Sequence, residues 1–396
     1  MYQAEHATLA AGAILGRAER SRHAGEHMGL RILVADTYYD AFLAEYERAN
    51  ADAADLPYRA ENARLMARHF GTGDAYAAGF RSCGCEAETV VLNARSLQNR
   101  WAREHNVPAG GVDARWDPNI FIAQVRDLRP DVLFVQELSV TSDEVLDAVK
   151  PFAGMIVGQI ACSLPAKRTF APYDLIVSSW PPIVDYFREN GKPAEWCPLG
   201  FDSSVAAKLA NEPTRYDVTF VGGLGQVHSE RIALLEYLCR HLRIDVFGYG
   251  LDTLPQDSPI RSHHHGTAWG IDAYRALAAS AITVNAHGTI EVPGDPCNHL
   301  ANNCRLFEAT GVGTLLLTDW KENLGRLFGP GVEVATYTSA DECLERIRYF
   351  LDRRDELQTV ARAGQRRTLA EHTYNHRAQT LLELFAASPH AGGGRC

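Results

Sequence analysis

The sequence predicts an α/β protein built from two Rossmann-like, doubly wound domains. A chain of 396 residues is too long for one ordinary hydrophobic core. Short apolar runs that suit buried strands alternate with helical patterns, which is typical of parallel sheets covered by helices on both faces. This alternation starts again after about residue 215, which indicates a second domain of the same kind. We therefore expect two parallel sheets with a ligand-binding cleft between them.

The composition favours a soluble globular protein. Hydrophobic residues make up 46% of the chain and charged residues 22%. The formal net charge of -10 argues against a nucleic-acid partner, which would need a basic surface. No apolar segment approaches the roughly 20 residues of a transmembrane helix. The nine cysteines are scattered and show no zinc spacing, so we expect no metal site and reduced thiols in a cytoplasm of bacterial type.

Residues 1–27 are expected to form a flexible N-terminal extension outside the fold. The apolar run at 9–15 follows Glu5 and lacks the basic region of a secretory signal. An alternative is that the native chain starts at Met28, directly before the first predicted strand.

Residues 28–200 are predicted to form the N-terminal domain. Pro181 opens a helix there, because a missing amide costs nothing in a first turn, and Gly191 ends it. Apolar runs place the strands at 30–36, 89–93, 132–135, 155–160 and 175–179. Helical spacing places further helices at 60–70, 74–81, 119–128 and 145–149.

Residues 201–215 show no clear period and are interpreted as the linker between the domains. The C-terminal domain is expected at 216–365, followed by a closing helix at 366–386 and a disordered tail at 387–396. Its predicted strands lie at 217–221, 245–248, 281–285, 314–318 and 332–335.

The stretch at 302–318 has the pattern of a short helix that ends at a glycine and leads into a buried strand. Asn302 or Asn303 is predicted to cap the helix, because its side-chain oxygen can accept from free first-turn amides. Gly311 is predicted to take the left-handed conformation that ends the helix.

Two groups of residues in the second domain are candidates to bind a phosphorylated ligand. Gly222 and Gly223 directly follow a predicted strand, where backbone amides can approach a phosphate. Arg231 either faces that phosphate or lies on a solvated helix face. Arg305 and Glu308, three residues apart on one helix face, either grip a hydroxylated, phosphorylated ligand or form an ordinary surface ion pair.

Candidate catalytic residues follow other predicted strands. In the first domain Asp36, Thr37 and Tyr38 follow the first predicted strand, where a dinucleotide-binding fingerprint would have glycines. This counts against a dinucleotide site in that domain. Glu137 follows a buried strand and is the best candidate for a base, or else caps the next helix. Asn285 and His287 end a strand that faces the cleft, with a structural role for His287 as the alternative. Residues 263–265 are three histidines without a carboxylate or cysteine at ligand spacing, and we interpret them as an ordinary loop.

By these residues the second half resembles the C-terminal domain of the spore-maturation CgeB-like glycosyltransferases, a branch of the GT-B superfamily. The first half is similar as well, so the resemblance runs from about residue 30 to 385. The matching segments are 158–161, 173–179, 198–202, 217–222 with Arg231, 269–274, Asn285, 303–311 with Gly313, and 372–374 with Arg377.

The resemblance implies a GT-B glycosyltransferase that transfers a sugar from a nucleoside-diphosphate sugar, held by the C-terminal domain, to a glycan, protein or small-molecule acceptor on the N-terminal domain. Glu308 would accept hydrogen bonds from donor hydroxyls. Arg305 and Arg231 would neutralise the leaving diphosphate without a metal or cofactor. Glu137 and His287 are the predicted catalytic residues. The predicted donor-binding residues are Gly222, Gly223, Arg231, Tyr249, Asn285, Arg305, Glu308, Gly311 and Gly313.

Several alternatives stay open at the level of sequence. Position 301 is alanine, whereas retaining GT-B enzymes carry two glutamates seven residues apart, so retention and inversion are both open. The rival functions are a nucleotide-sugar epimerase or hydrolase on the same fold, and a non-catalytic sugar-nucleotide-binding protein. The oligomeric state is open between a monomer and a homodimer.

Overall fold

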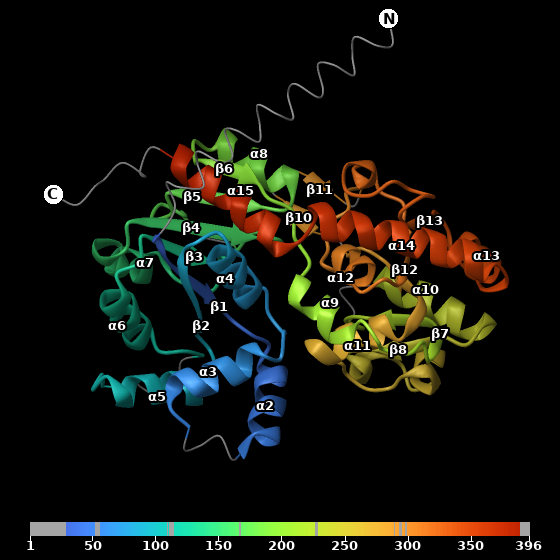
Figure 1. The fold of residues 1–396 in the computed structure, drawn as a ribbon, viewed down its shortest axis with the longest axis horizontal. Coiled ribbons are helices and arrows are strands. Elements are labelled where there is room, and N and C mark those ends of the chain that lie inside the picture. The colour runs from blue at the N-terminus through green and yellow to red at the C-terminus, as the bar shows by residue number, and fades with distance from the viewer. Residues whose placement is uncertain are drawn as a thin grey trace, which may run out of the picture.

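The computed structural model describes residues 29–51, 56–108, 110, 115–165, 168–225, 229–288, 290–292, 295–297 and 299–388. The predicted extension at 1–27 and residues 389–396 of the predicted tail lie outside this part of the chain. Two parallel sheets form two α/β units that lie side by side (Figure 1). No helix within the described ranges is both long and apolar enough to cross a membrane.

The first sheet has six parallel strands in the order β2-β1-β3-β4-β5-β6. Their inner residues are almost wholly buried, because helices cover both faces. All five predicted strands are present, and β6 adds an edge strand that the sequence analysis missed. The strands are β1 (Arg31–Asp36), β2 (Glu86–Val91), β3 (Val132–Val135), β4 (Met155–Ile160), β5 (Leu175–Ser178) and β6 (Ala194–Trp196).

The helices predicted at 60–70, 74–81, 119–128, 145–149 and from Pro181 are present, one of them with an early stop, and the structure adds a helix at Arg95–Glu104 that the sequence analysis missed. The helix expected at 60–70 already ends at Met66, and His69 takes a left-handed conformation with φ of 50°. The chain therefore turns sharply before the next helix. The helices are α2 (Asp40–Ala49), α3 (Tyr58–Met66), α4 (Gly73–Ser82), α5 (Arg95–Glu104), α6 (Pro118–Leu128), α7 (Asp143–Val149) and α8 (Pro181–Glu189).

The segment interpreted as a linker, 201–215, contains a helix, α9 (Ser203–Leu209). Asp202 caps it by accepting a hydrogen bond from the amide of Ser204. Phe201 and Val205 are buried against the second unit. The segment is too short to show a helical period clearly, and its packing makes it part of the second unit rather than a free connection.

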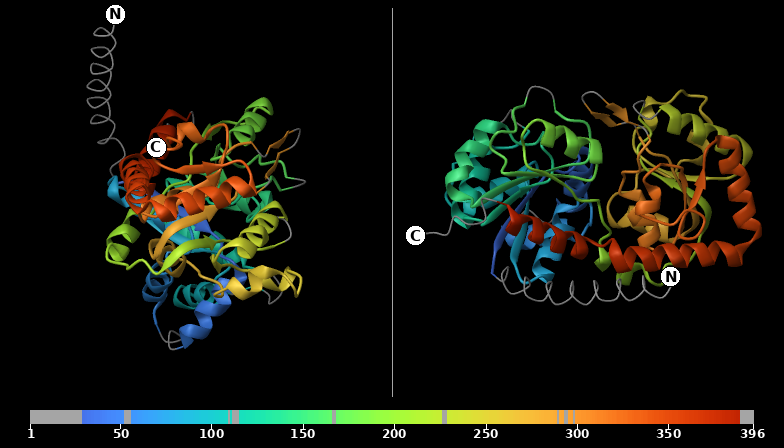
Figure 2. Two further views of the ribbon diagram at one scale, coloured as in Figure 1. Left: turned by 90° about the vertical axis from the view of Figure 1, so that its right-hand side faces the viewer. Right: turned by 90° about the horizontal axis from the view of Figure 1, so that it is seen from above.

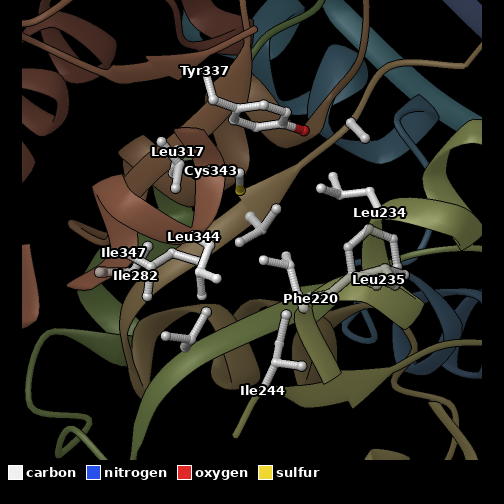
Figure 3. Close-up of a cluster of buried hydrophobic side chains, with 14 of the residues drawn as sticks. Phe220, Leu234, Leu235, Ile244, Ile282, Leu317, Tyr337, Cys343, Leu344 and Ile347 are labelled. Atoms are coloured by element: carbon white, nitrogen blue, oxygen red, sulfur yellow. The ribbon is translucent and has the colours of Figure 1, made fainter. Parts of the chain in front are cut away.

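The second sheet has five parallel strands in the order β13-β12-β9-β7-β8, and a two-stranded hairpin, β10–β11, stands apart from it. Figure 3 shows how side chains of α10 and α13 pack on the sheet, with Leu235 on the side of Phe220 and Leu344 on the side of Ile282. The strands are β7 (Tyr216–Val221), β8 (Asp245–Phe247), β9 (Ser280–Asn285), β10 (Ile290–Val292), β11 (Asp295–Cys297), β12 (Leu315–Asp319) and β13 (Ala335–Tyr337). The helices are α10 (Ser229–His241), α11 (Ile271–Ala278), α12 (Arg305–Gly311) and α13 (Ala340–Asp352).

The end of the chain ties the two units together. Helix α14 (Arg354–Glu371) packs on α12 of the second unit, and α15 (Tyr374–Ala387) packs on α4 of the first. Figure 2 shows these helices running along one side of both units. The closing helix predicted at 366–386 is thus divided between α14 and α15, because Thr373 caps a new helix with His376. Ala387, which was expected in a disordered tail, is the last residue of α15.

Candidate functional site

A cavity of about 390 Å³ lies between the two units. Its size is within the range of small-molecule sites, roughly 300–1,000 Å³. The carboxyl ends of β1, β7, β8 and β9 open into it, as expected for ligand sites of parallel sheets. Lining residues that carry chemistry are Asp36, Tyr39, His69, Gly222, Gly223, Arg231, Tyr249, Trp269, Asn285, Asn303, Cys304, Arg305 and Glu308.

The predicted glycine loop lies in the cavity wall. A Cβ on Gly223 would lie 2.9 Å from the tip of the Tyr249 ring, so glycine lets this ring lie directly against the loop. Tyr249 is 40% exposed and stacks on Trp269, with ring centroids 5.3 Å apart. The loop therefore places the backbone of Gly223 beside an aromatic platform at the ends of β7 and β8, while the amide of Gly222 donates to the carbonyl of Phe247.

Arg231 belongs to the cavity wall and is not a solvated helix residue. Its Nε and Nη2 donate to the carbonyl of Ala286 at 3.2 and 2.8 Å, and its Nη1 donates to the carbonyl of Gly223 at 3.2 Å. Burial lowers the pKa of the guanidinium. The side chain thus places a positive charge between the ends of β7 and β9.

Arg305 and Glu308 form an ion pair inside the cavity. Arg305 Nη1 lies 2.6 Å from Glu308 Oε2, and the two side chains are only 15% and 17% exposed. This burial distinguishes the pair from an ordinary surface pair. Both charged groups line the same wall of the cavity as Arg231.

The predicted asparagine cap of α12 is wrong. The residue before the helix is Cys304, and no side chain caps it. Asn303 Nδ2 instead donates to Asn285 Oδ1 at 3.0 Å, and Asn285 Nδ2 donates to the hydroxyl of Thr318 at 2.9 Å. The amides are used to join α12 to the ends of β9 and β12, which a local pattern cannot reveal.

The prediction that Gly311 ends α12 in a left-handed conformation is also wrong. Gly311 lies within the last turn, and Gly313 is the residue with positive φ, 89°. A Cβ on Gly311 would overlap the ring of Phe201, and one on Gly313 would lie 2.9 Å from the Gln365 side chain. Neither glycine is among the described residues that line the cavity. The structure thus gives both glycines a packing role.

The two predicted catalytic residues lie outside the cavity lining. His287 Nδ1 is 2.6 Å from Asp319 Oδ1, and the imidazole is 4% exposed. Burial opposes ionisation of Asp319, but hydrogen bonding to His287 and the charge of Lys321 lower its pKa to about 2. Glu137 Oε1 accepts hydrogen bonds from the amide and hydroxyl of Ser139, and it does not cap the next helix, α7, because Ser142 is the residue that caps it.

Asp36 is the residue that the sequence analysis overlooked. It ends β1, is 7% exposed and lines the cavity. Its Oδ1 accepts from the amide of Thr37 at 2.8 Å and its Oδ2 from the amide of Gly73 at 3.1 Å. Burial raises its pKa to about 6, and the charge of Glu137 adds to the effect. A carboxylate at the end of the first buried strand was the signal present in the sequence.

Residues 67–72, between α3 and α4, bring the first unit against the second at the rim of the cavity. Phe70 contacts Trp269 edge to face at 5.5 Å between ring centroids. His69 Nδ1 lies 2.7 Å from Asp202 Oδ2, and Lys208 Nζ lies 2.6 Å from His69 Nε2. Both nitrogens of this cavity-lining histidine are thus engaged by the residues around α9.

Similarity to known proteins is distributed unevenly along the chain. Residues 231–383 match the family described as "Glycosyl transferase-like". No curated protein matches the chain significantly in sequence.

The described part of the chain contains no group of three or more His, Cys, Asp or Glu residues placed to hold a metal ion.

The fold is shared at low sequence identity with solved structures, one of which is a glycosyltransferase. Sucrose-phosphate synthase from Thermosynechococcus elongatus is 12% identical, with a TM-score of 0.53 over 91% of this chain and 100% of that one. Anabaena HepE in complex with UDP-glucose is 12% identical, with a TM-score of 0.54 over 90% and 100%. AviGT4, a glycosyltransferase of avilamycin A biosynthesis, is 13% identical, with a TM-score of 0.56 over 92% and 99%.

These likenesses span both units and confirm the predicted GT-B fold of two Rossmann-like domains. With a glycosyl transferase-like C-terminal part on this fold, the chain is a glycosyltransferase, as the sequence predicted.

Proposed function

We propose that the protein transfers a sugar from a nucleoside-diphosphate sugar to an acceptor nucleophile in the interdomain cavity, as a member of the CgeB-like group of GT-B enzymes. The observation that carries the proposal is the buried Arg305–Glu308 pair in a cavity to which both domains contribute. A buried carboxylate paired with one arginine, in a cavity that a second arginine also lines, suits a ligand that presents hydroxyls and phosphates together.

The donor is assigned to the C-terminal wall. Arg231 and Arg305 lie on the same wall, where their charges can offset the charge that develops on the leaving diphosphate. Gly223 adjoins Tyr249, whose exposed ring suits a nucleobase or sugar face. Two arginines in the wall support transfer without a metal ion. The complex of Anabaena HepE with UDP-glucose supports a nucleotide sugar as donor.

The acceptor is assigned to the N-terminal wall, where Asp36, Tyr39 and Phe70 line the cavity. A hydroxylated acceptor such as a glycan or a small metabolite suits the mixture of a carboxylate and aromatic rings, because sugars present both hydroxyls and apolar faces. Closure of the two domains around both substrates would exclude water, which would otherwise hydrolyse the donor.

Thermal stabilisation tests the donor site. Purified protein is melted with each nucleoside diphosphate, its sugars, and NAD, for the wild type and Glu308→Ala. One nucleotide series is expected to stabilise the wild type by about 2.7 kcal/mol at 100 times its dissociation constant, and Glu308→Ala should lose the effect. Glu356→Ala is the matched control. Glu356 also pairs with an arginine three residues away, because its Oε1 lies 3.8 Å from Arg353 Nε, but this pair is exposed on the surface. Stabilisation by NAD alone would contradict the proposal.

Turnover separates the proposed transferase from its rivals. A transferase releases nucleoside diphosphate quickly only when an acceptor is present. An epimerase or hydrolase would convert the donor without an acceptor, and a non-catalytic protein would bind the donor without converting it.

A further inference from the structure

We infer that Asp36 is the general base that deprotonates the acceptor, and that the transfer inverts the configuration of the anomeric carbon. This inference rests on the proposed function. It concerns a residue of the first domain, whereas the proposed donor site lies on the second.

The position of Asp36 is the first argument. It lies at the carboxyl end of β1 and lines the same cavity as Arg231 and Arg305, which belong to the opposite domain. A sugar whose diphosphate is held by the two arginines would have its anomeric carbon between them and Asp36. An acceptor beside Asp36 would then approach from the side opposite the leaving group, which is the geometry of inversion.

The second argument is that Glu308 and His69, which could also accept a proton in the cavity, already contact charged side chains. Among the described lining residues the carboxylates are Asp36 and Glu308, and Glu308 is paired with Arg305 at 2.6 Å. His69 contacts Asp202 through one nitrogen and Lys208 through the other. Asp36 is therefore the lining carboxylate without a cation beside it, and position 301, where retaining enzymes carry a glutamate, is a buried alanine.

The backbone holds the Asp36 carboxylate in place. Each oxygen accepts one amide hydrogen bond, from Thr37 and from Gly73, which leaves each oxygen able to accept one more. A Cβ on Gly71 or Gly73 would lie 2.8 or 2.9 Å from Asp36 Oδ2. Side chains at these two positions would crowd the oxygen that an acceptor hydroxyl must reach. A purely structural role, as a cap for α4, would use only the bond from Gly73.

The protonation state suits this role. Burial raises the pKa of Asp36 to about 6, the two amide bonds act against this, and the charge of Glu137 adds to it. A base with a pKa close to the working pH is ionised and still takes up a proton readily. The charged and titratable groups around it are Glu137 after β3, Asp74 on α4, Tyr38 and Tyr39 after β1, His69, and, across the cavity, Arg231, Tyr249, Arg305 and Glu308.

The step balances as a single displacement. The acceptor oxygen forms a bond to the anomeric carbon while its proton passes to Asp36. The bond between the anomeric carbon and the diphosphate oxygen breaks, and its electron pair leaves with the diphosphate. Asp36 then releases the proton to solvent, so the products are the glycoside of opposite anomeric configuration, nucleoside diphosphate and one proton.

The test uses the full chain and the donor found by melting, with a panel of sugar and polyol acceptors. Product configuration is read by proton NMR, and kcat/KM is measured from pH 4.5 to 9 for the wild type, Asp36→Asn, Glu137→Gln and Asp74→Asn. We expect an inverted product, an acid limb near pH 6, and a loss of about 10²–10⁴-fold in Asp36→Asn with the nucleotide-induced stabilisation kept. Glu137→Gln should move the acid limb to lower pH, and Asp74→Asn, on the same helix as Gly73, should behave as wild type.

Each contrary outcome is decisive. A product of retained configuration, or Asp36→Asn activity within tenfold of wild type, overturns the inference while leaving glycosyl transfer intact. If Asp36→Asn does not fold, the wild-type product configuration and acid limb still decide. Failure of the wild type to bind or convert any nucleotide sugar overturns the proposed function first, and this inference with it.

Discussion

The carbonyl oxygen of Arg68 accepts a hydrogen bond from the amide of Ile271 at 2.7 Å, which joins the two domains at the rim of the cavity. Gly270 makes this approach possible: its φ is 53°, and a Cβ there would overlap the same carbonyl oxygen. The guanidinium of Arg68 adds an ion pair with Asp272 at 2.8 Å, although both side chains are partly exposed. This contact therefore depends on a glycine more than on charge.

Gly270→Ala should weaken donor binding by opening the domains. Losing one interdomain hydrogen bond costs about 1 kcal/mol, and the overlap adds to this, so we expect the donor dissociation constant to rise by about tenfold. Calorimetry measures the affinity, and small-angle scattering measures the opening. Gly266→Ala is the control, because it also has a positive φ but no atom within 4 Å of its added Cβ. Equal effects of the two variants would assign the change to backbone strain alone.

Glu308→Ala should destabilise the fold as well as abolish donor binding. Removing one member of a buried ion pair leaves an uncompensated charge and lowers the free energy of unfolding by roughly 3–5 kcal/mol. Because the Arg305 side chain is still 15% exposed, we expect a loss near the lower end of this range. The double variant Arg305→Met/Glu308→Leu should recover most of the stability in urea denaturation but still fail to bind nucleotide. Nucleotide binding by the double variant at wild-type affinity would remove this pair from the donor site.

Gly311→Ala tests the packing role of a glycine that the sequence analysis placed in the donor site. Its Cβ would overlap the ring of Phe201, which is fully buried, so we expect a loss of roughly 1–3 kcal/mol from overpacking. Gly325→Ala, with no atom near the added Cβ, should change the free energy of unfolding by less than about 0.5 kcal/mol. Donor affinity of folded Gly311→Ala should stay close to that of the wild type, and a selective loss of affinity would restore the original interpretation.

The stability of the protein should fall as the pH is lowered from 6.5 to 4, in part through His372. Burial and the charge of Arg377 lower the pKa of this imidazole from 6.5 to about 4. Its Nε2 donates to the carbonyl of Leu327 and its Nδ1 accepts from Arg377, so the neutral ring is the one that fits. Between these pH values the unfolded chain binds a proton that the folded chain excludes, which contributes about 3 kcal/mol to the loss.

Urea denaturation at pH 7 and at pH 4.5 measures this loss. His372→Gln should be less stable at pH 7 and show a smaller dependence on pH, whereas His241→Gln, at the exposed end of α10, should keep the wild-type dependence. A wild-type unfolding free energy that is the same at both pH values would contradict the lowered pKa of His372 in the folded protein.

The functional site shows where local reasoning from the sequence succeeds. Arg231, Arg305, Glu308 and Asn285 were named from the sequence and all line the cavity. Each lies at or just after the end of a predicted strand or on the face of a predicted helix, and parallel sheets bring such positions to one edge. The resemblance to GT-B enzymes added the expectation that two such edges face each other.

The same reasoning misplaced residues whose role depends on distant partners. Glu137 and His287 follow buried strands, yet their side chains point to Ser139 and Asp319 rather than into the cavity. Gly311 is required because Phe201, from the segment that was interpreted as a linker, packs against it. A pattern of neighbouring residues contains no information on such contacts.

The order of buried strands and helices and the existence of two α/β units could be predicted from the sequence, because hydrophobic period and turn residues are properties of contiguous segments. The glycosyltransferase class came instead from the resemblance of its motifs to those of GT-B enzymes. Three features depend on contacts between distant segments: the desolvation of Asp36 in the cavity that the arginines also line, the close approach of the domains at Gly270, and the return of α15 to the first domain. Burial, and with it the pKa of a carboxylate, is set by which segments pack together across the whole chain.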